Sequence, residues 1–319
     1  MKKFKLSVAL LCGILLFTAC GQNTEQPADE STPQSTEQTA EESTQEDENT
    51  AVEPILSLDE YPKVDGSTAN LPLMAEVMSR ATGISLEEAE ELTSCDMTPQ
   101  AWYNLAEGAS DLLLVYEPAE ATVEKLEEIG TPLTYEAIGN DALVFIVNEN
   151  NPVDSLTIDQ LKGIYKGEIT NWSEVGGNDE EIVAFQRSEE SGSQSLFIKL
   201  LMQGEEPMEA PTELAPGLMG ELIDSLAEYN NEGNAIGFSV YYYASYMYTQ
   251  PGLKFIAVDG VSPRDETIAS GEYPFINPFY AAIRTDEPED SPARKLYNFV
   301  IGEEGVKAMK AAGYIPIEK

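Results

Sequence analysis

Residues 187–195 read Arg-Ser-Glu-Glu-Ser-Gly-Ser-Gln-Ser, a loop that the pattern predicts to end in a helix. The helical spacing is set by four apolar residues that follow it: Leu196, Phe197, Leu200 and Leu201. The first N–H groups of a helix lack internal partners, and glycine lets a ligand approach the backbone closely. The stretch is therefore predicted to cradle an anion, with Arg187 as its full positive charge and Ser191, Gly192 and Ser193 as donors. The alternative is a capped surface helix with a solvated arginine.

Two other turns rich in hydroxyls precede predicted helices. Residues 65–72 read Asp-Gly-Ser-Thr-Ala-Asn-Leu-Pro, so Ser67 and Thr68 stand before a helix that ends at Gly83. Thr98 precedes Pro99 at the start of a second helix. Each turn is a candidate anion site, and for each the alternative is a simple helix cap.

A glutamate follows one of the predicted strands directly. Asp111 and the apolar run that follows it predict a strand over residues 111–116, and Glu117-Pro118 comes at its carboxyl end. In α/β folds, ligands bind beyond the carboxyl ends of strands, so Glu117 is a candidate site residue. The alternative is a solvated loop carboxylate.

Strands and helices alternate along the chain. Apolar runs predict strands over residues 111–116, 142–148, 182–185, 235–240 and 279–283. Predicted helices lie between them, including a tyrosine-rich helix over residues 241–248. The alternation predicts an α/β body with largely parallel sheets.

The N-terminal residues predict an export signal and a lipid anchor. Lysines 2, 3 and 5 precede an apolar run, residues 6–17, that is too short to span a bilayer. Residues 17–21, Phe-Thr-Ala-Cys-Gly, resemble a bacterial lipobox, with Phe17 in place of the usual leucine. We predict a signal peptide over residues 1–19 and lipid on Cys20; the alternative is an ordinary secretory signal.

Residues 21–53 contain ten acidic residues and no lysine or arginine. Such a segment cannot bury enough apolar surface to fold, so residues 20–53 are predicted to be a disordered acidic tether. The folded body is then residues 54–319, which is long enough for two lobes. Its single cysteine, Cys95, is expected to be a buried apolar residue.

The charge of the chain excludes several functions. The net charge is −39, and removing the ten acids of the tether and the three lysines of the signal leaves −32 for the body. A field of that sign argues against a nucleic-acid partner, and an anion site must therefore act locally. The chain has no histidine, the commonest transition-metal ligand and general base. We expect no metal and no cofactor.

Together these motifs resemble the phosphate-binding proteins of phosphate ABC transporters, within the type II periplasmic solute-binding superfamily. The resemblance covers nearly all of residues 60–317. The motifs that carry it are, in chain order, Asp65-Gly66-Ser67-Thr68, Asn151-Pro152-Val153, residues 167–172 (Gly-Glu-Ile-Thr-Asn-Trp) with Gly176-Gly177, Arg187 with Ser191-Gly192-Ser193, Ala235-Ile236-Gly237-Phe238 and Gly313-Tyr314-Ile315-Pro316.

The resemblance implies a two-lobe type II periplasmic-binding-protein fold, α/β, with mixed, mostly parallel sheets joined by two crossover strands. It implies a first lobe over residues 54–140 plus 241–319 and a second over residues 141–240. The ligand-binding residues that it implies are Ser67, Thr68 and Thr98 from the first lobe, Arg187, Ser191, Gly192 and Ser193 from the second, and Glu117. The family has an aspartate or arginine near Glu117, and often a threonine where Ser193 stands.

The implied function is that of a monomeric, lipid-anchored protein on the extracytoplasmic face of the cell membrane. It would capture inorganic phosphate and deliver it to the permease and ATPase subunits of an ABC importer. A carboxylate in the site is tolerable only if it accepts a proton from the ligand, so Glu117, or else Asp65, would favour hydrogen phosphate over sulfate. The alternatives are another oxyanion or small organic anion, a surface receptor or adhesin without transport, and an enzyme. The sequence lacks a Gly-x-Ser-x-Gly motif, which argues against a hydrolase.

Overall fold

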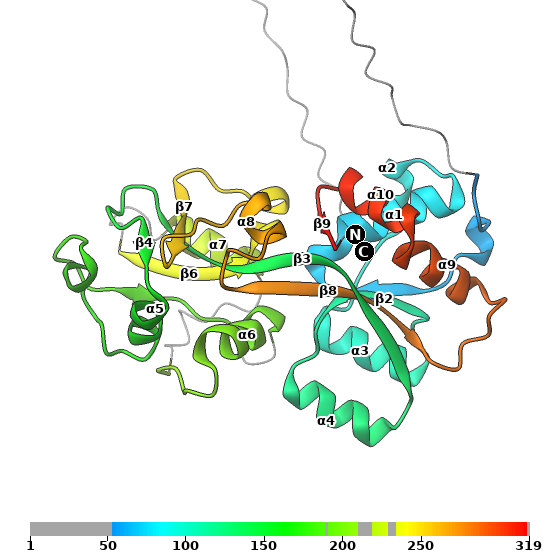
Figure 1. Ribbon diagram of the computed structural model, residues 1–319, viewed down its shortest axis with the longest axis horizontal. Helices are drawn as coiled ribbons and strands as arrows, with labels where there is room; N and C mark the ends of the chain where they lie inside the picture. The colour runs from blue at the N-terminus through cyan, green and yellow to red at the C-terminus, as the bar shows by residue number, and fades with distance from the viewer. Residues whose placement is uncertain (1–52, 189–190, 210–218, 229–233, 318–319) are drawn as a thin grey trace, which may run out of the picture. The chain divides into compact units, whose positions relative to one another are not determined.

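The computed structural model describes residues 53–188, 191–209, 219–228 and 234–317 (Figure 1). The chain divides into two units, residues 1–50 and 51–319, and the predicted signal peptide, Cys20 and nearly all of the predicted tether lie outside the described residues. The α-helices are α1 (Leu71–Thr82), α2 (Leu86–Leu92), α3 (Thr98–Glu107), α4 (Glu120–Ile129), α5 (Ile158–Tyr165), α6 (Gly192–Phe197), α7 (Met219–Glu228), α8 (Asp265–Ala269), α9 (Pro292–Ile301) and α10 (Glu303–Ala311).

Shorter helical turns and strands β1 to β9 complete the description of the second unit. The 3₁₀ turns are η1 (Leu58–Glu60), η2 (Thr68–Asn70) and η3 (Trp172–Val175), and the π-helical turns are η4 (Ile198–Met202) and η7 (Tyr243–Met247). The strands are β1 (Val64–Gly66), β2 (Leu112–Tyr116), β3 (Leu133–Asn148), β4 (Ser155–Leu156), β5 (Val183–Ala184), β6 (Ala235–Val240), β7 (Leu253–Val258), β8 (Ile276–Arg284) and β9 (Ile315–Pro316).

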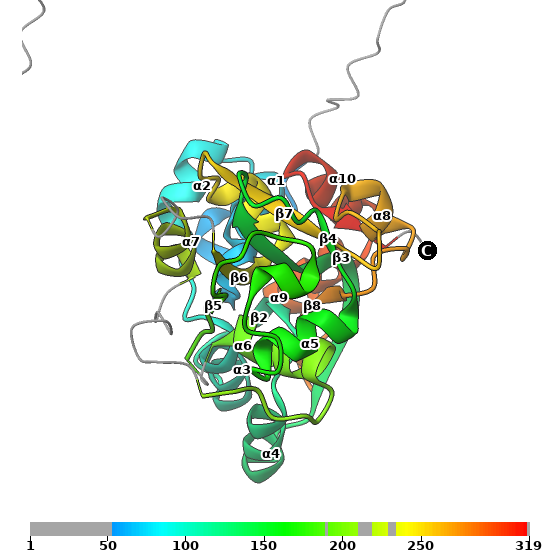
Figure 2. The same ribbon diagram turned by 90° about the vertical axis from the view of Figure 1, so that its left-hand side faces the viewer.

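Two groups of strands share the long strand β3. Residues 133–142 of β3 pair with β8, which also pairs with β2, and β2 pairs with β1. Residues 143–148 of β3 pair instead with β6 and β7. We call the first group and the helices packed on it the first lobe, and the second group and its helices the second lobe. Figure 1 shows β3 and β8 running side by side between the two lobes, and Figure 2 faces the second lobe, with α5 and α6 below β6 and β7.

The expectation of an α/β fold with mixed sheets joined by two crossing strands is confirmed, but the expectation that the sheets are mostly parallel is wrong. Among the described strands, β1–β2, β4–β7 and β5–β6 pair in parallel, whereas β3 is antiparallel to β6, β7, β8 and β9 and β2 is antiparallel to β8. A strand buried on both faces is a continuous apolar run in either direction, so the pattern could not distinguish the two.

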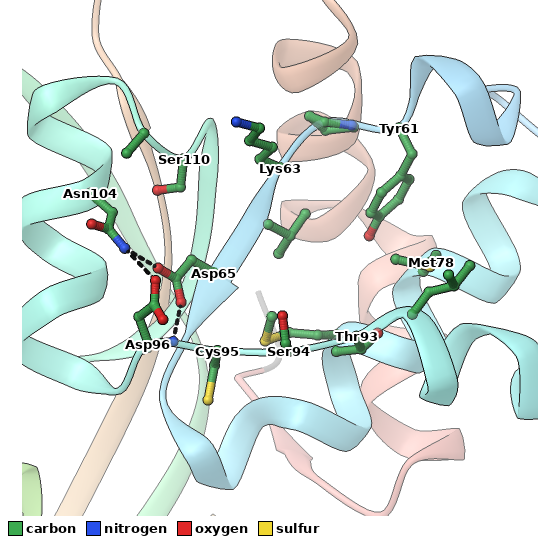
Figure 3. Close-up of a pocket in the computed structure, with 15 residues that line it drawn as sticks. Tyr61, Lys63, Asp65, Met78, Thr93, Ser94, Cys95, Asp96, Asn104 and Ser110 are labelled. Atoms are coloured by element: carbon green, nitrogen blue, oxygen red, sulfur yellow. Dashed lines mark hydrogen bonds between the residues drawn. The ribbon is translucent and has the colours of Figure 1, made fainter. Parts of the chain in front are cut away.

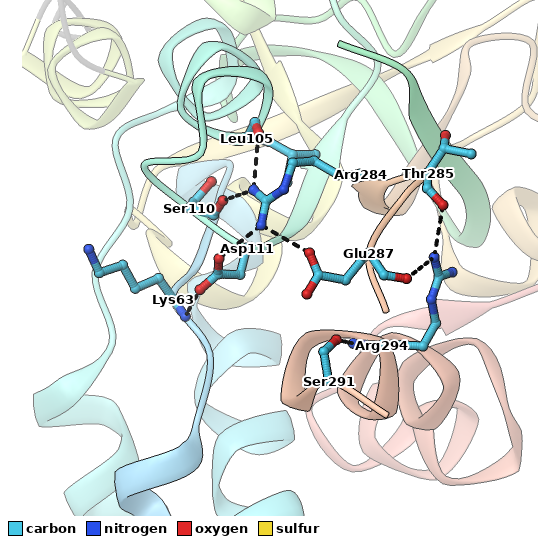
Figure 4. A network of polar contacts seen from close by, with 9 residues as sticks. All are labelled: Lys63, Leu105, Ser110, Asp111, Arg284, Thr285, Glu287, Ser291 and Arg294. Atoms are coloured by element: carbon cyan, nitrogen blue, oxygen red, sulfur yellow. Dashed lines mark hydrogen bonds and ion pairs between the residues drawn. The ribbon is translucent and has the colours of Figure 1, made fainter. Parts of the chain in front are cut away.

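Buried apolar strands hold the first lobe together, and a polar network closes its far end. Every residue of β2 is buried, as the run of leucines predicts. At the end of β8, the Arg284 guanidinium donates to the carbonyl oxygens of Leu105 (3.2 Å) and Ser110 (2.6 Å). It also pairs with Asp111 (3.0 Å) and Glu287 (3.1 Å), as Figure 4 shows. These bonds fasten the connection between α3 and β2, so α3 is held beside the sheet of the first lobe.

Candidate functional site

A cavity of about 1160 Å³ lies between the two lobes. Its walls come from η2 and α3 of the first lobe and from α6, α7 and η7 of the second. Seven of the eight predicted ligand-binding residues line it: Ser67, Thr68, Thr98, Arg187, Ser191, Gly192 and Ser193. Three segments that lie far apart in the sequence therefore meet at one place.

The first-lobe half of the cavity presents two linked hydroxyls. Gly66 brings the chain against β2 so closely that a Cβ there would lie 1.9 Å from the carbonyl oxygen of Leu114. Ser67 follows, and its Oγ lies 2.7 Å from Thr98 Oγ1 and accepts the N–H of Tyr116 at 3.0 Å. The two hydroxyls have two protons and use one between themselves, so the pair retains one O–H to donate to a ligand.

The carboxylate of Asp65 holds the segment before Thr98 in place. It accepts the N–H of Gly66 (2.7 Å), the N–H of Asp96 (2.8 Å) and the side-chain amide of Asn104 (2.8 Å). Figure 3 shows Asp65, Asp96 and Asn104 converging in a smaller pocket. Asp65 is buried and does not line the larger cavity between the lobes, so its contacts position the backbone that leads into α3.

The second-lobe half carries the positive charge. Arg187 is only 7% exposed. Its backbone N–H donates to Gln194 Oε1 (2.9 Å), and Gln194 in turn donates to Gln186 (3.0 Å). The Arg187 guanidinium donates to Ser193 Oγ at 3.3 Å, and Ser193 Oγ lies 3.0 Å from Ser191 Oγ. Hydrogen bonds therefore join the arginine to the start of α6.

Arg187 stays charged despite its burial. Burial lowers the pKa of Arg187 to about 10, while the negative charge of Glu221 acts in the opposite direction. A guanidinium with that pKa is protonated at neutral pH. A buried, desolvated cation attracts an anion more strongly than an exposed one, because water screens it less.

The two halves touch at Gly192. A Cβ at this position would lie 2.9 Å from Thr98 Oγ1, which is shorter than real Cβ contacts. Gly192 is the first residue of α6, which continues directly into η4. Because Gly192 lies against Thr98, the start of α6 faces the hydroxyl pair of the first lobe. The backbone of Gly192 does not have a positive φ, so its conformation alone does not require glycine. The closeness of the lobes does require it, because a side chain would clash with Thr98.

Glu117 lies outside the residues that line the cavity. Its carboxylate forms an ion pair with Lys199 of η4, so it joins the two lobes at an exposed edge. Among the described residues, the acidic ones that line the cavity are Asp96, Glu221 and Asp224. Glu221 and Asp224 stand in α7, and sequence reasoning missed them because no motif marks that helix.

Tyrosines form the wall next to α7. Tyr243 and Tyr248 stack with their ring centroids 5.8 Å apart, and Tyr248 donates its hydroxyl to Asp224 at 2.6 Å. In these contacts the rings pack against each other, while the polar tip of Tyr248 forms a hydrogen bond, as is common for buried tyrosines.

Two further observations on the described residues bear on other kinds of function. Over residues 53–317, apart from the three undescribed gaps, no cluster of His, Cys, Asp or Glu has the arrangement of a metal site. The helices in this same part of the chain are all too short or too polar to cross a membrane.

A family model described as a PBP superfamily domain matches residues 33–304. The chain belongs to the PBP superfamily. Among curated relatives, a phosphate-binding protein PstS of Bacillus subtilis is 30% identical over 172 residues, which cover 54% of this chain and 53% of the relative. A PstS of Borreliella burgdorferi is 27% identical over 197 residues, which cover 60% of this chain and 69% of the relative. The matches thus span about half to two thirds of these relatives.

Solved structures of the same superfamily match over nearly their whole length. A putative phosphate ABC transporter substrate-binding protein from Clostridium perfringens, solved with bound phosphate, has a TM-score of 0.60 and 26% identity, covering 80% of this chain and 98% of that one. An ABC-type phosphate transport receptor from Vibrio cholerae has a TM-score of 0.59 and 26% identity, covering 79% and 98%. These two matches therefore cover about four fifths of this chain.

Proposed function

We propose that this protein is the substrate-binding component of an ABC importer and that it captures inorganic phosphate between its lobes. The observation that carries the proposal is the meeting of the buried Arg187 with serine and threonine hydroxyl groups in one cavity, with Gly192 against Thr98. The names of the relatives from Bacillus subtilis and Clostridium perfringens support phosphate as the ligand.

The geometry suits a small tetrahedral oxyanion. Such a ligand accepts hydrogen bonds in several directions, and here donors come from a guanidinium, from hydroxyls and from the start of a helix. Charge-assisted hydrogen bonds contribute about 1.5–3 kcal/mol each. Three or four of them, less the cost of closing the lobes, give affinity near the micromolar range, about −8 kcal/mol.

The carboxylates around the cavity favour a ligand that carries a proton. Hydrogen phosphate has a proton to donate at neutral pH and sulfate does not, so an ionised carboxylate repels sulfate without compensation. The sequence predicts that Glu117 accepts a hydrogen bond from that proton, and this remains a prediction. Glu221 is a second candidate, because it lines the cavity and its charge acts on Arg187.

Capture by closure requires two lobes that move as bodies. The sequence-based prediction places the second boundary between the lobes at residue 241, where the chain would return to the first lobe. The pairing of β7 with residues 145–148 of β3 favours a later return, along β8, with residues 241–275 in the second lobe. We adopt that later boundary.

We further propose that lipid on Cys20 anchors the protein to the extracytoplasmic face of the membrane, where it acts as a monomer with a permease and an ATPase. The support is the lipobox-like sequence around Cys20. Cys20→Ala should release the protein from membranes or block its processing. Membrane association that is unchanged by this substitution contradicts the anchor.

A binding role without catalysis fits the residues best. The chain has no histidine, and among the described residues the guanidinium of Arg187 donates a hydrogen bond to Ser193 of the Ser-Gly-Ser turn. The named relatives are binding proteins. A different small anion, or a receptor that no longer transports, is an alternative that the same cavity permits.

Calorimetry of the purified body separates these alternatives. Phosphate, sulfate and small organic anions are titrated in turn into the protein and into its Arg187→Ala variant. We expect phosphate to bind near the micromolar range, and the variant to bind it much more weakly. No phosphate binding, with tight binding of another anion, would falsify the proposal.

A further inference from the structure

A buried carboxylate lies where β3 passes from the first lobe to the second. Asp141 is 2% exposed and pairs with Asn277 of β8 in the first lobe. Leu143, two residues later, pairs with Val240 in the second lobe. Asp141 is not among the residues that line the anion cavity, so the proposed binding role does not explain it.

Both lobes donate hydrogen bonds to this carboxylate. The hydroxyl of Tyr116, at the end of β2, donates to Oδ2 at 2.5 Å. The backbone N–H of Tyr242, just after β6, donates to Oδ1 at 3.0 Å, and the N–H of Ala142 donates to the same oxygen at 2.7 Å. Burial raises the pKa of Asp141 to about 6, and these donors oppose that effect. The carboxylate therefore serves as a hydrogen-bond acceptor for both lobes.

One arm of the network ends on the hydroxyl pair of the cavity. Tyr116 gives its side-chain hydroxyl to Asp141 and its backbone N–H to Ser67 Oγ, at 3.0 Å. Ser67 Oγ lies 2.7 Å from Thr98 Oγ1. The orientation of the free O–H that faces a ligand therefore depends on where Tyr116 is held.

A second arm ends on the neighbouring turn. The rings of Tyr242 and Tyr314 stack with their centroids 3.6 Å apart and 14° between their planes. The hydroxyl of Tyr314 donates to the carbonyl oxygen of Ala69 at 2.6 Å. Ala69 belongs to η2, directly after Thr68, and also lines the cavity. Both arms thus run from the crossing strand to residues 67–69.

We propose that Asp141 is a positioning residue that ties the arrangement of the two lobes to the ligand-binding turn 67–69. The role rests on the proposed anion-binding function. When the lobes are arranged as here, Asp141 holds Tyr116 and Tyr242 together, and through them it fixes Ser67 and Ala69. When β6 moves away from β2, the carboxylate can no longer serve both donors, and the turn loses its support.

Three tyrosine variants test the two arms. Tyr116→Phe and Tyr314→Phe each remove one hydroxyl of the network. Tyr273→Phe is the matched control, because Tyr273 is also fully buried and donates its hydroxyl to the carbonyl oxygen of Leu143 at 3.0 Å, two residues from Asp141. Calorimetry with phosphate at neutral pH should show affinity about 2- to 30-fold weaker in the first two variants, the range for coupling through such networks. The control should retain the affinity of the wild type.

Asp141→Asn distinguishes positioning from simple charge. If the carboxylate acted only as a buried negative charge, its removal would strengthen anion binding. Positioning predicts weaker binding, because a neutral amide at this position no longer makes a charge-assisted bond with the Tyr116 hydroxyl. A gain in phosphate affinity on this substitution overturns the proposal, as does unchanged affinity in both Tyr116→Phe and Tyr314→Phe.

Amide hydrogen exchange of the ligand-free protein gives a readout that does not depend on phosphate. Residues 67–70 should exchange faster in Tyr116→Phe and Tyr314→Phe than in the wild type and in Tyr273→Phe. Equal exchange in all four proteins contradicts the positioning role. Failure of the wild type to bind phosphate would reject the proposed ligand, while the exchange rates would still decide the role of Asp141.

Discussion

The two halves of the cavity differ in the groups that they present to a ligand. The second-lobe half has a full charge, Arg187, bound to Ser193 in the same short segment of sequence. The first-lobe half has neutral hydroxyls, those of Ser67 and Thr98. Hydrogen bonds of Asp65, of Tyr116 and of the crossing strand β3 hold these hydroxyls in position. The charged half is held together by contacts within one short segment, whereas the positions of the neutral hydroxyls depend on several other parts of the fold. A ligand should therefore bind first to the second lobe, and closure should add the first.

Removing the charge of Arg187 tests the half of the cavity that is expected to contribute more to the binding free energy. Arg187→Ala should weaken phosphate binding by about 2–4 kcal/mol, the range for losing the partner of a buried charged group. Arg187→Lys, which keeps the charge but loses the planar fork, should lose less. Calorimetry measures both. Equal losses in the two variants would mean that hydrogen-bond geometry outweighs charge.

Adding one methyl group at the contact between the halves tests whether they must meet. Gly192→Ala places a Cβ 2.9 Å from Thr98 Oγ1, so the lobes cannot approach as closely. We expect affinity to fall by about 1–3 kcal/mol, as for overpacking. Small-angle scattering should show a less compact protein at saturating phosphate. Because Thr98→Ala removes the clashing oxygen, the double variant should lose less than the sum of the two single ones.

The hydroxyl pair should behave as one donor. The double variant Ser67→Ala/Thr98→Ala should cost about 1 kcal/mol of binding free energy, the usual value of a neutral hydrogen bond. Each single variant should cost less, because the hydroxyl that remains keeps a proton that the pair no longer uses and can donate it to the ligand. Losses of about 1 kcal/mol in each single variant that add in the double one, measured by calorimetry, would show that each hydroxyl donates to the ligand separately.

The smallest effect is expected at the ion pair between the lobes. Glu117 and Lys199 are both exposed, and such pairs contribute about 0–1 kcal/mol. If Glu117 only joins the lobes, Glu117→Gln and Lys199→Met should weaken phosphate and sulfate binding equally. A changed ratio of phosphate affinity to sulfate affinity in Glu117→Gln alone would instead identify Glu117 as the group that accepts the ligand's proton. Glu221→Gln is the comparison variant for that role.

The parts of the site that local sequence determines were predictable. A turn, its hydroxyls and the helix after it lie close together in the chain, so Ser67, Thr98, Arg187 and the start of α6 were found from the pattern, and all of them line the cavity. The partner of Glu117 was not predictable, because Lys199 is 82 residues away and belongs to the other lobe.

The sheets show a similar limit. The pattern indicated a strand over residues 142–148, where every side chain is buried, but missed the first half of β3, where buried and exposed residues are mixed. It therefore also missed that one strand serves both lobes. The role proposed for Asp141 follows from that crossing and has no local signal.

The burial of Arg187 inside so acidic a body has a kinetic consequence. A phosphate ion approaching from solution meets a repulsive field before it reaches the buried guanidinium, so its capture should be slower than encounter by diffusion alone. Added salt screens that field over about 10 Å at 0.1 M, but it hardly screens the desolvated contact with the guanidinium. Association should therefore become faster as ionic strength rises, the reverse of what is usual when a protein binds an ion of opposite charge.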